Sequence, residues 1–197
     1  KADWVVDEMG FELNIPGNYN KLNAAAAIAV CKFLGVDMDS LIAGIQTYEG
    51  CKRRLEKVAD KKGVLYYDDY AHTPNEIKSV LQAVKESFPG KRIVCCFQPH
   101  TYSRTKKFLK ELARSFNDAD LVGVVDVYSS SRETDTMGVN SKTLASEIKK
   151  SHPNPRHVNY IGNLENLTRS LKSVLKSGDV CLTLGAGDIY KIHRLLV

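Results

Sequence analysis

The sequence predicts an α/β fold in which a mostly parallel β-sheet is covered by helices on both faces. From about residue 63 onward, short apolar runs alternate with amphipathic segments. The run 121–125 (LVGVV) is almost continuously apolar, which is typical of a strand buried on both faces. The amphipathic segments repeat apolar residues at helical spacing. Because this alternation requires right-handed crossovers, we expect a doubly wound, Rossmann-like domain.

Five strands and three helices follow from these patterns. The strands are expected at residues 64–68, 92–97, 121–127, 157–161 and 179–184. The helices are expected over residues 77–88, 108–116 and 164–175.

The first 49 residues have a different pattern. We expect short strands within residues 2–14 and a turn at 16–18. An Ala-rich helix should follow over residues 20–34, and a second helix should run from Asp39 to near Thr47. Two helices and a short strand cannot enclose a core. Residues 1–49 are therefore predicted to be the end of a preceding central domain, cut from a longer polypeptide, and residues 50–197 a second domain.

The composition is that of an ordinary soluble domain. Hydrophobic residues make up 43% of the 197 residues, and the net charge is +5. The basic residues are spread along amphipathic segments, so no nucleic-acid partner is expected. The five cysteines match no zinc spacing and are predicted to be free thiols in a reducing compartment, the cytoplasm. No signal peptide or membrane-spanning segment is recognisable.

Polar clusters follow four of the predicted strands. They occupy residues 68–74 (DDYAHTP), 98–104 (QPHTYSR), 128–133 (YSSSRE) and 185–188 (GAGD). The loops at the opposite ends, such as 87–91 and 176–178, hold ordinary turn residues. Ligands of open α/β sheets bind beyond the carboxyl ends of the strands. This asymmetry therefore predicts a site at that edge.

Several side chains of these clusters are candidates for ligand contact. Two adjacent carboxylates, Asp68 and Asp69, repel each other unless they meet a cation, sugar hydroxyls or donors from a ligand, so we expect a ligand role for at least one. His72 and His100 follow neighbouring strands. The guanidinium of Arg104 is shaped to bind a carboxylate or a phosphate.

Other features have structural interpretations. Residues 73–76 (TPNE) form a capping box with proline at the first helical position. The glycines of 185–187 let the backbone approach an anion, but the third glycine of a dinucleotide fingerprint is replaced by Tyr190. No phosphate-binding P-loop, nucleophile elbow or H-E-x-x-H metal site occurs, and no metal ligand is predicted.

Taken together, these motifs resemble the Mur ligases. The stretches 68–74, 98–104 and 185–188 resemble motifs of their C-terminal domain, and the stretch 17–24 (GNYNKLNA) is similar to their adenine-side motif. The stretch 50–54 (GCKRR) looks like the arginine pair that opens the C-terminal domain. The match is nearest to the branch that adds L-alanine. Tyr19 and Thr73 stand where His is usual in the family or in that branch, and Thr101 where some members have Arg.

The resemblance implies a three-domain enzyme of peptidoglycan synthesis, and thus a role in cell-wall formation, cell shape and division. An N-terminal domain would bind UDP-N-acetylmuramate. A central domain would carry the P-loop and the ligands of Mg²⁺, and the C-terminal domain would bring L-alanine. ATP would convert the muramate carboxylate to an acyl phosphate, which the amino group attacks. Without its N-terminal and central domains, this chain should be inactive.

The resemblance also implies roles for nucleotide-binding residues. Asn20 and Asn23 would contact adenine, and Arg53 or Arg54 would reach the ATP phosphates. Asp68 would bind ribose hydroxyls or order the nucleotide.

A second set is implied for the amino acid and the chemistry. Tyr70 and His72 would line the amino-acid pocket, while His100 and Arg104 would hold carboxylate or phosphate oxygens near the forming bond. The candidate catalytic residues are His72, His100 and Arg104. Residues 48–54 would act as the hinge between domains.

Three alternatives remain open from the sequence. One is another ligase of this superfamily: the peptide-recycling branch, the diamino-acid-adding branch or folylpolyglutamate synthase. The second is a nucleotide-binding module without catalysis. The third, a dinucleotide-dependent oxidoreductase, is disfavoured by the incomplete glycine fingerprint.

Overall fold

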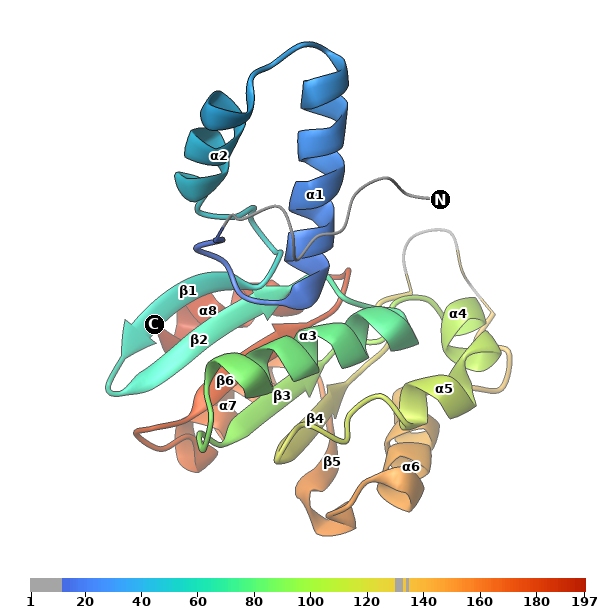
Figure 1. Cartoon of the computed structure of the whole chain (residues 1–197). Helices are drawn as coiled ribbons and strands as arrows, with labels where there is room; N and C mark the ends of the chain where they lie inside the picture. The colour runs from blue at the N-terminus through green and yellow to red at the C-terminus, as the bar shows by residue number, and fades with distance from the viewer. Residues whose placement is uncertain (1–11, 130–132, 134) are drawn as a thin grey trace.

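The computed structural model describes residues 12–129, 133 and 135–197. A sheet with helices on both faces forms the main body, and a pair of helices stands at one end of it (Figure 1). Most of the segment predicted to hold the first short strands, residues 2–14, lies outside the described residues. Its described part, residues 12–14, is not a strand.

The sheet has six strands in the order β1-β2-β6-β3-β4-β5. Their bounds are β1 Glu56–Lys61, β2 Val64–Asp69, β3 Ile93–Phe97, β4 Leu121–Val125, β5 Val158–Gly162 and β6 Val180–Leu184. All neighbouring pairs are parallel except β1 with β2. The predicted fold class and the five predicted strands are thus confirmed. The sequence pattern does not predict β1, which is joined to β2 by a tight turn with positive φ at Lys62 and Gly63.

Helices cover both faces of the sheet. Their bounds are α3 Pro74–Ser87, α4 Tyr102–Lys107, α5 Leu109–Ala113, α6 Ser141–Ser151, α7 Leu164–Val174 and α8 His193–Leu196, with short 3₁₀ turns at Pro155–His157 (η2) and Ile189–Ile192 (η3). Alternating strand residues divide between two cores. One contains Cys95 and Leu182 with α3, α5 and α6, and the other contains Cys96 and Cys181 with α7 and η3.

One helical prediction needs correction. The helix predicted over residues 108–116 is observed only as α5, Leu109–Ala113. The short helix α4 precedes it, and the two are separated at Phe108, whose φ of −108° and ψ of 21° are not helical. The helix α6 and the C-terminal turns η3 and α8 were not predicted. The capping box is confirmed, because the Glu76 carboxylate accepts a hydrogen bond from Thr73 N at 3.0 Å.

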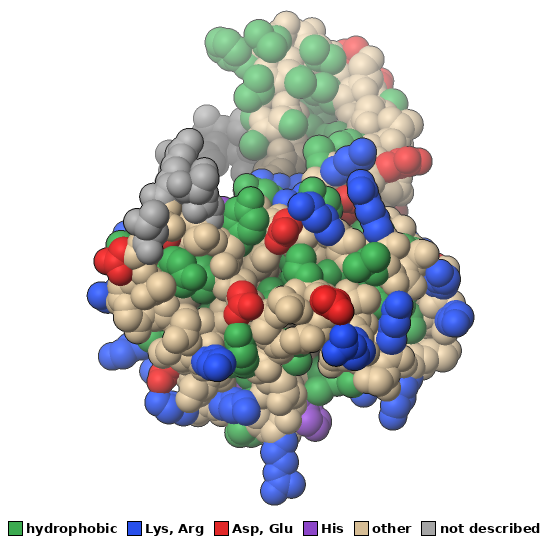
Figure 2. Space-filling model, turned by 180° about the vertical axis from the view of Figure 1, so that it is seen from behind, with side chains coloured by type: hydrophobic (Ala, Val, Ile, Leu, Met, Phe, Trp, Pro, Cys, Tyr) green, Lys and Arg blue, Asp and Glu red, His purple; other side chains and the backbone are tan. Residues whose placement is uncertain are grey.

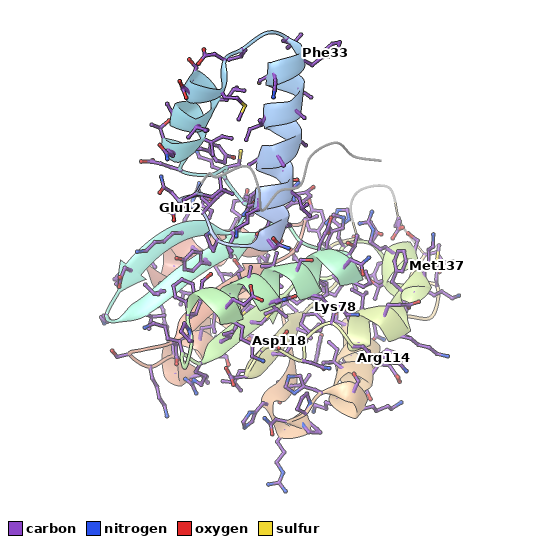
Figure 3. All side chains as sticks on the ribbon, in the orientation of Figure 1. Glu12, Phe33, Lys78, Arg114, Asp118 and Met137 are labelled. Atoms are coloured by element: carbon purple, nitrogen blue, oxygen red, sulfur yellow. The ribbon has the colours of Figure 1, made fainter. Side chains whose placement is uncertain are left out.

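The helical pair consists of α1 Asn18–Phe33 and α2 Met38–Gln46. Its buried residues are few: Asn20, Ala25 and Ile28 in α1, and none in α2. The far end of the pair carries exposed hydrophobic side chains, which Figure 2 shows in green. Phe33, 90% exposed, lies at the tip of α1 (Figure 3). The boundary predicted at residue 50 stays a prediction.

All five cysteines are free, and Cys95, Cys96 and Cys181 are buried, as predicted. Among the helices that the structure describes, none has the length and hydrophobicity needed to cross a membrane.

Candidate functional site

The polar clusters of the sequence meet at one edge of the sheet. β6 lies between β2 and β3, with Leu184 paired to Asp69 on one side and to Phe97 on the other. Phe97 is in turn paired to Val124 of β4. Since these strands end at the same level, the loops that follow them lie next to each other. The expected shared edge is therefore present. The strands before His72 and His100 are not the expected neighbours, because β6 lies between β2 and β3.

Four rings from three of these loops form a continuous row. Tyr70 and His72 follow β2, His100 follows β3, and Tyr128 follows β4. Successive ring centroids are 5.5, 5.8 and 5.7 Å apart, and the rings of His100 and Tyr128 are nearly parallel. In the sequence, Tyr128 belongs to a polar cluster, and nothing there distinguishes it from its neighbours. Its backbone bridge to His100 could be seen only in the folded chain.

Arg104 is joined to this row through His100. Its Nη1 lies 2.8 Å from His100 Nδ1. Because a guanidinium can only donate, Nδ1 accepts, and the ring is a neutral imidazole with its proton on Nε2. Partial burial, followed by the nearby charges of Arg104 and His72, lowers the pKa of His100 below its ordinary value.

His72 presents the opposite hydrogen-bonding character. Its Nδ1 lies 3.0 Å from the carbonyl oxygen of Tyr70, to which it donates. In the neutral ring, Nε2 therefore carries a lone pair. Neither Nε2 of His72 nor that of His100 has a hydrogen-bond partner in the described part of the chain. The edge thus offers one imidazole acceptor, one imidazole donor and the remaining N–H groups of Arg104.

Thr101 holds a strained backbone between these groups. Its φ is 66° and its ψ 146°, a region that residues with a Cβ rarely occupy. Thr101 N donates to Tyr128 O at 3.0 Å, and Thr101 Oγ1 accepts from Arg104 N at 3.4 Å. Such strain costs about 1–3 kcal/mol and is typical of functional sites. Here it turns the chain sharply between His100 and α4.

The two acidic residues after β2 have internal partners. Asp68 is 2% exposed, and its carboxylate accepts from Arg53 Nε at 3.0 Å and from the Thr183 hydroxyl. Asp69 accepts from the backbone N–H groups of Leu55 and Ala71, both at 2.7 Å, and burial raises the pKa of Asp69 to about 6. Both carboxylates therefore have hydrogen-bond donors within the fold, with one side-chain donor on each oxygen of Asp68. A ligand role for either of them stays a prediction.

The two adjacent arginines extend in different directions. The guanidinium of Arg53 lies 4.9 Å from the Tyr70 ring centre and 4.5 Å from that of Tyr190, and its Nη2 donates to Gly185 O. Arg54 lies 5.7 Å from the Tyr70 ring and lines a separate cavity. Tyr70 therefore contacts both arginines and His72.

That cavity, of about 620 Å³, lies between the helical pair and the start of the sheet domain. Asn20, Asn23 and Arg54 line it together with apolar side chains, so three of the predicted nucleotide-binding residues meet there. Asn20 Nδ2 donates to Pro16 O at 2.6 Å. The mixture of an apolar wall, two amides and one guanidinium is suited to a planar ring attached to an anion.

The glycine turn after β6 packs closely against β3. A Cβ at Gly185 would lie 2.7 Å from Gln98 O, and one at Gly187 would meet both Gln98 Oε1 and the Tyr128 ring. Gln98 Nε2 donates to Asp188 at 2.9 Å, and Gln98 Oε1 accepts from Ile189 N at 3.0 Å. These contacts explain the glycines without an anion.

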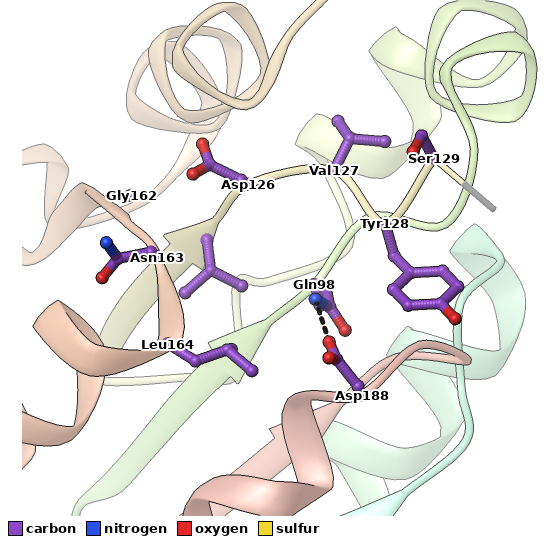
Figure 4. Close-up of a pocket in the computed structure, with 10 residues that line it drawn as sticks. Gln98, Asp126, Val127, Tyr128, Ser129, Gly162, Asn163, Leu164 and Asp188 are labelled. Carbon is purple, nitrogen blue, oxygen red and sulfur yellow. Dashed lines mark hydrogen bonds between the residues drawn. The ribbon is translucent and has the colours of Figure 1, made fainter. Parts of the chain in front are cut away.

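A second cavity, of about 470 Å³, opens beside this turn (Figure 4). Gln98, Tyr128 and Asp188 line one side of it, and Asp126 and Asn163 the other. In the described residues, no group of three or more His, Cys, Asp and Glu side chains could hold a metal ion.

An α/β fold with an open polar edge at the carboxyl ends of parallel strands is typical of ligand-binding domains. The chain belongs to the Mur ligase family, since residues 53–187 match the family model described as Mur ligase, glutamate ligase domain.

Curated relatives agree with this assignment. The chain is 43% identical over 187 residues to the UDP-N-acetylmuramate–L-alanine ligase of Desulfitobacterium hafniense (strain Y51), covering 95% of this chain and 41% of that protein. It is 44% identical to the protein of the same name from Alkaliphilus metalliredigens (strain QYMF), covering 95% of this chain and 39% of that protein. The chain thus spans about two fifths of the length of these relatives.

A solved structure is similar over nearly the whole chain. It is the UDP-N-acetylmuramate-alanine ligase of Thermotoga maritima, with a TM-score of 0.78 and 30% identity. The match covers 94% of this chain and 38% of the Thermotoga chain.

Proposed function

We propose that this chain is the C-terminal part of an ATP-dependent ligase that joins L-alanine to UDP-N-acetylmuramate in peptidoglycan synthesis. The observation that carries the proposal is the 43% identity, over 95% of the chain, to a relative with that name. The cytoplasm is the location proposed with it, because ATP is available there.

The proposed enzyme contains two further domains, an N-terminal one for the UDP-sugar and a central one for the ATP phosphates. The exposed apolar end of α1 and α2 supports this, because surfaces of that kind are typical of contact sites. Residues 1–49 would complete the central domain, and residues 50–197 would form the C-terminal domain. Mg²⁺ would be held by the central domain, since the described residues contain no cluster of ligands for it.

The ring row and Arg104 form the proposed site for L-alanine. The N–H groups of Arg104 that His100 leaves free can bind the carboxylate of the amino acid in a bidentate manner. The lone pair on Nε2 of His72 can accept a proton from the ammonium group, which frees the nucleophile. The Nε2–H of His100 can donate to an oxygen that gains charge as the amide bond forms.

The proposed nucleotide site is the cavity between the helical pair and the sheet domain. Asn20 and Asn23 would contact the adenine ring, and Arg54 lines the same cavity. Arg53 would face the phosphates when the domains close. Asp68 would act indirectly, through its ion pair with Arg53.

An activity assay of the full-length protein tests this function. Release of ADP and phosphate should require both UDP-N-acetylmuramate and L-alanine. The matched substitutes for L-alanine are a preformed tripeptide, a diamino acid and glutamate. Faster turnover with one of these would reassign the protein to another ligase branch. ATP binding without turnover of any acceptor would leave a nucleotide-binding module instead.

A further inference from the structure

A network of hydrogen-bonded, buried polar groups connects the last helix to Arg53. His193 Nε2 lies 2.8 Å from Thr183 Oγ1, and the Thr183 hydroxyl donates to one oxygen of Asp68. The other oxygen of Asp68 accepts from Arg53 Nε at 3.0 Å. His193, Thr183 and Asp68 are at most 3% exposed. The parallel pairing of β2 with β6 sets Asp68 directly beside Thr183.

The donor and acceptor of each hydrogen bond in this network follow from the protons that each group carries. Asp68 is paired with a guanidinium and therefore accepts on both oxygens. Thr183 has one proton. It goes to Asp68, which is charged and closer than the other acceptor, the Tyr67 carbonyl oxygen 3.3 Å away, so the Thr183 oxygen accepts from His193 Nε2–H. His193 is thus neutral with its proton on Nε2. Its Nδ1 is buried and has no hydrogen-bond partner within the described residues, and burial lowers the pKa of His193.

Arg53, at the other end of this network, is also held by several contacts. Arg53 and Leu55 both have left-handed backbone, with φ of 59° and 46°. Arg53 N donates to Glu56 at 2.8 Å, and Arg53 O accepts from Tyr70 N at 2.8 Å. With Nε bound to Asp68 and Nη2 to Gly185 O, only Nη1 lacks a hydrogen bond to the described residues. The guanidinium is therefore held in one orientation before any ligand arrives.

The unpaired Nδ1 of His193 needs a structural explanation, because buried polar atoms without a hydrogen bond are rare. An apolar residue at position 193 would avoid this cost but would leave the Thr183 oxygen without its donor. The His193 tautomer that donates to the Thr183 oxygen through Nε2–H is the one that leaves Nδ1 without a hydrogen bond. The cost of burying Nδ1 without a partner is therefore offset by the hydrogen-bond network that ends at Arg53.

We infer that Thr183 and His193 are positioning residues that orient Arg53, through Asp68, toward the phosphates of the nucleotide. The inference rests on the proposed function for the identity of that ligand. It assigns a role in nucleotide binding to two residues that cannot touch the nucleotide. Both are buried in the sheet and in the helix that follows it.

Steady-state kinetics of the full-length enzyme test the inference. Thr183→Val keeps the shape of the side chain but removes the hydroxyl, and His193→Leu removes the donor. Each should raise KM for ATP by about threefold or more and leave KM for L-alanine unchanged. Thr183→Ser and His193→Gln retain the hydrogen bond and should restore KM for ATP. Thr168→Val is the matched control, because Thr168 is a buried threonine that bonds its own helix at Leu164 O, 2.9 Å away.

Selective ¹⁵N-arginine labelling of the same full-length protein gives a readout without turnover. The Arg53 Nε–H resonance, assigned with Arg53→Lys, should shift or broaden in Thr183→Val and stay in place in Thr183→Ser. An unchanged resonance in Thr183→Val, or equal rises in KM for Thr183→Val and Thr183→Ser, would overturn the inference. If the unmodified enzyme releases no ADP with any acceptor, the proposed function fails, and the resonance alone decides the positioning role.

Discussion

The two edges of the sheet contain similar polar residues, but these residues differ in how many of their hydrogen bonds are made within the fold. At the amino edge, Arg92 binds Asp179 through two contacts of 2.9 and 2.6 Å and also donates to Val174 O. His152 is buried, with Nε2 3.0 Å from Ala119 O and Nδ1 accepting from Asn154 N at 3.0 Å. Both nitrogens of this imidazole are used by the fold itself.

At the carboxyl edge, the corresponding groups are only half used. His72 and His100 each bond through Nδ1, while each Nε2 lacks a partner among the described residues. Asp68 and Asp69, at this same edge, are fully engaged internally. The difference separates polar side chains whose hydrogen bonds are made within the fold from side chains that keep an open donor or acceptor. We expect the ligand contacts to come from the second group.

The strongest test of the comparison is at the amino edge. Arg92→Ala leaves the buried carboxylate of Asp179 with one remaining donor, Lys176 N at 2.8 Å. Removing one partner of a buried ion pair is strongly destabilising. Since Arg92 is 33% exposed, we expect a smaller loss of about 2 kcal/mol in the free energy of unfolding. Urea denaturation measures it. Turnover of the folded variant should be normal, and a large fall in kcat would contradict the division between the edges.

At the carboxyl edge, Arg104→Ala should have the reverse effect. If Arg104 stabilises charge during the reaction, its loss should lower turnover by roughly tenfold or more, equivalent to about 1.4 kcal/mol. Unfolding by urea should change little, because Arg104 has open hydrogen-bonding capacity. Lys106→Ala, which removes an exposed cation from the same helix, is the control and should keep full activity. Unchanged kinetics for Arg104→Ala would remove its assigned role.

The sheet could be predicted from the sequence because its five parallel strands are apolar runs. β1 could not, since Glu56–Lys61 is a polar edge strand in which no side chain is fully buried. The shortness of α5 could not be predicted, because apolar residues at helical spacing continue to Phe116, beyond the end of α5 at Ala113.

The grouping of His72, His100 and Arg104 could also be predicted, because parallel strands end at a common edge. The true partners of Asp68 could not. Arg53 reaches it from a left-handed turn, and Thr183 from a strand more than a hundred residues away. Adjacent carboxylates in a sequence give no sign of such partners. The rule that ligands bind beyond strand ends predicts where a site lies. It does not distinguish residues that would touch a ligand from residues that hold those in place.

A titration can sharpen the contrast between the imidazoles. Burial and the charge of Arg104 keep the pKa of His100 below its ordinary value. His100 therefore stays neutral to lower pH than a free histidine, and Arg104→Ala should move its pKa upward. Its carbon-bound ring protons report the change by NMR, with His72 as the internal comparison. A pKa of His100 that falls in the variant would contradict the contact between Arg104 Nη1 and Nδ1.

The smallest effect is expected from the shorter ion pair at the amino edge. Lys85 Nζ lies 2.5 Å from Asp118, closer than any contact of Arg92 with Asp179. The side chains of this pair are 61% and 38% exposed, however, so water competes for both charges. Exposed pairs contribute about 0–1 kcal/mol, and we expect Lys85→Ala to fall within that range. Urea denaturation beside Arg92→Ala gives the comparison directly. If Lys85→Ala cost as much as Arg92→Ala, contact distance rather than burial would govern the strength of these pairs, and the account of the amino edge would have to change.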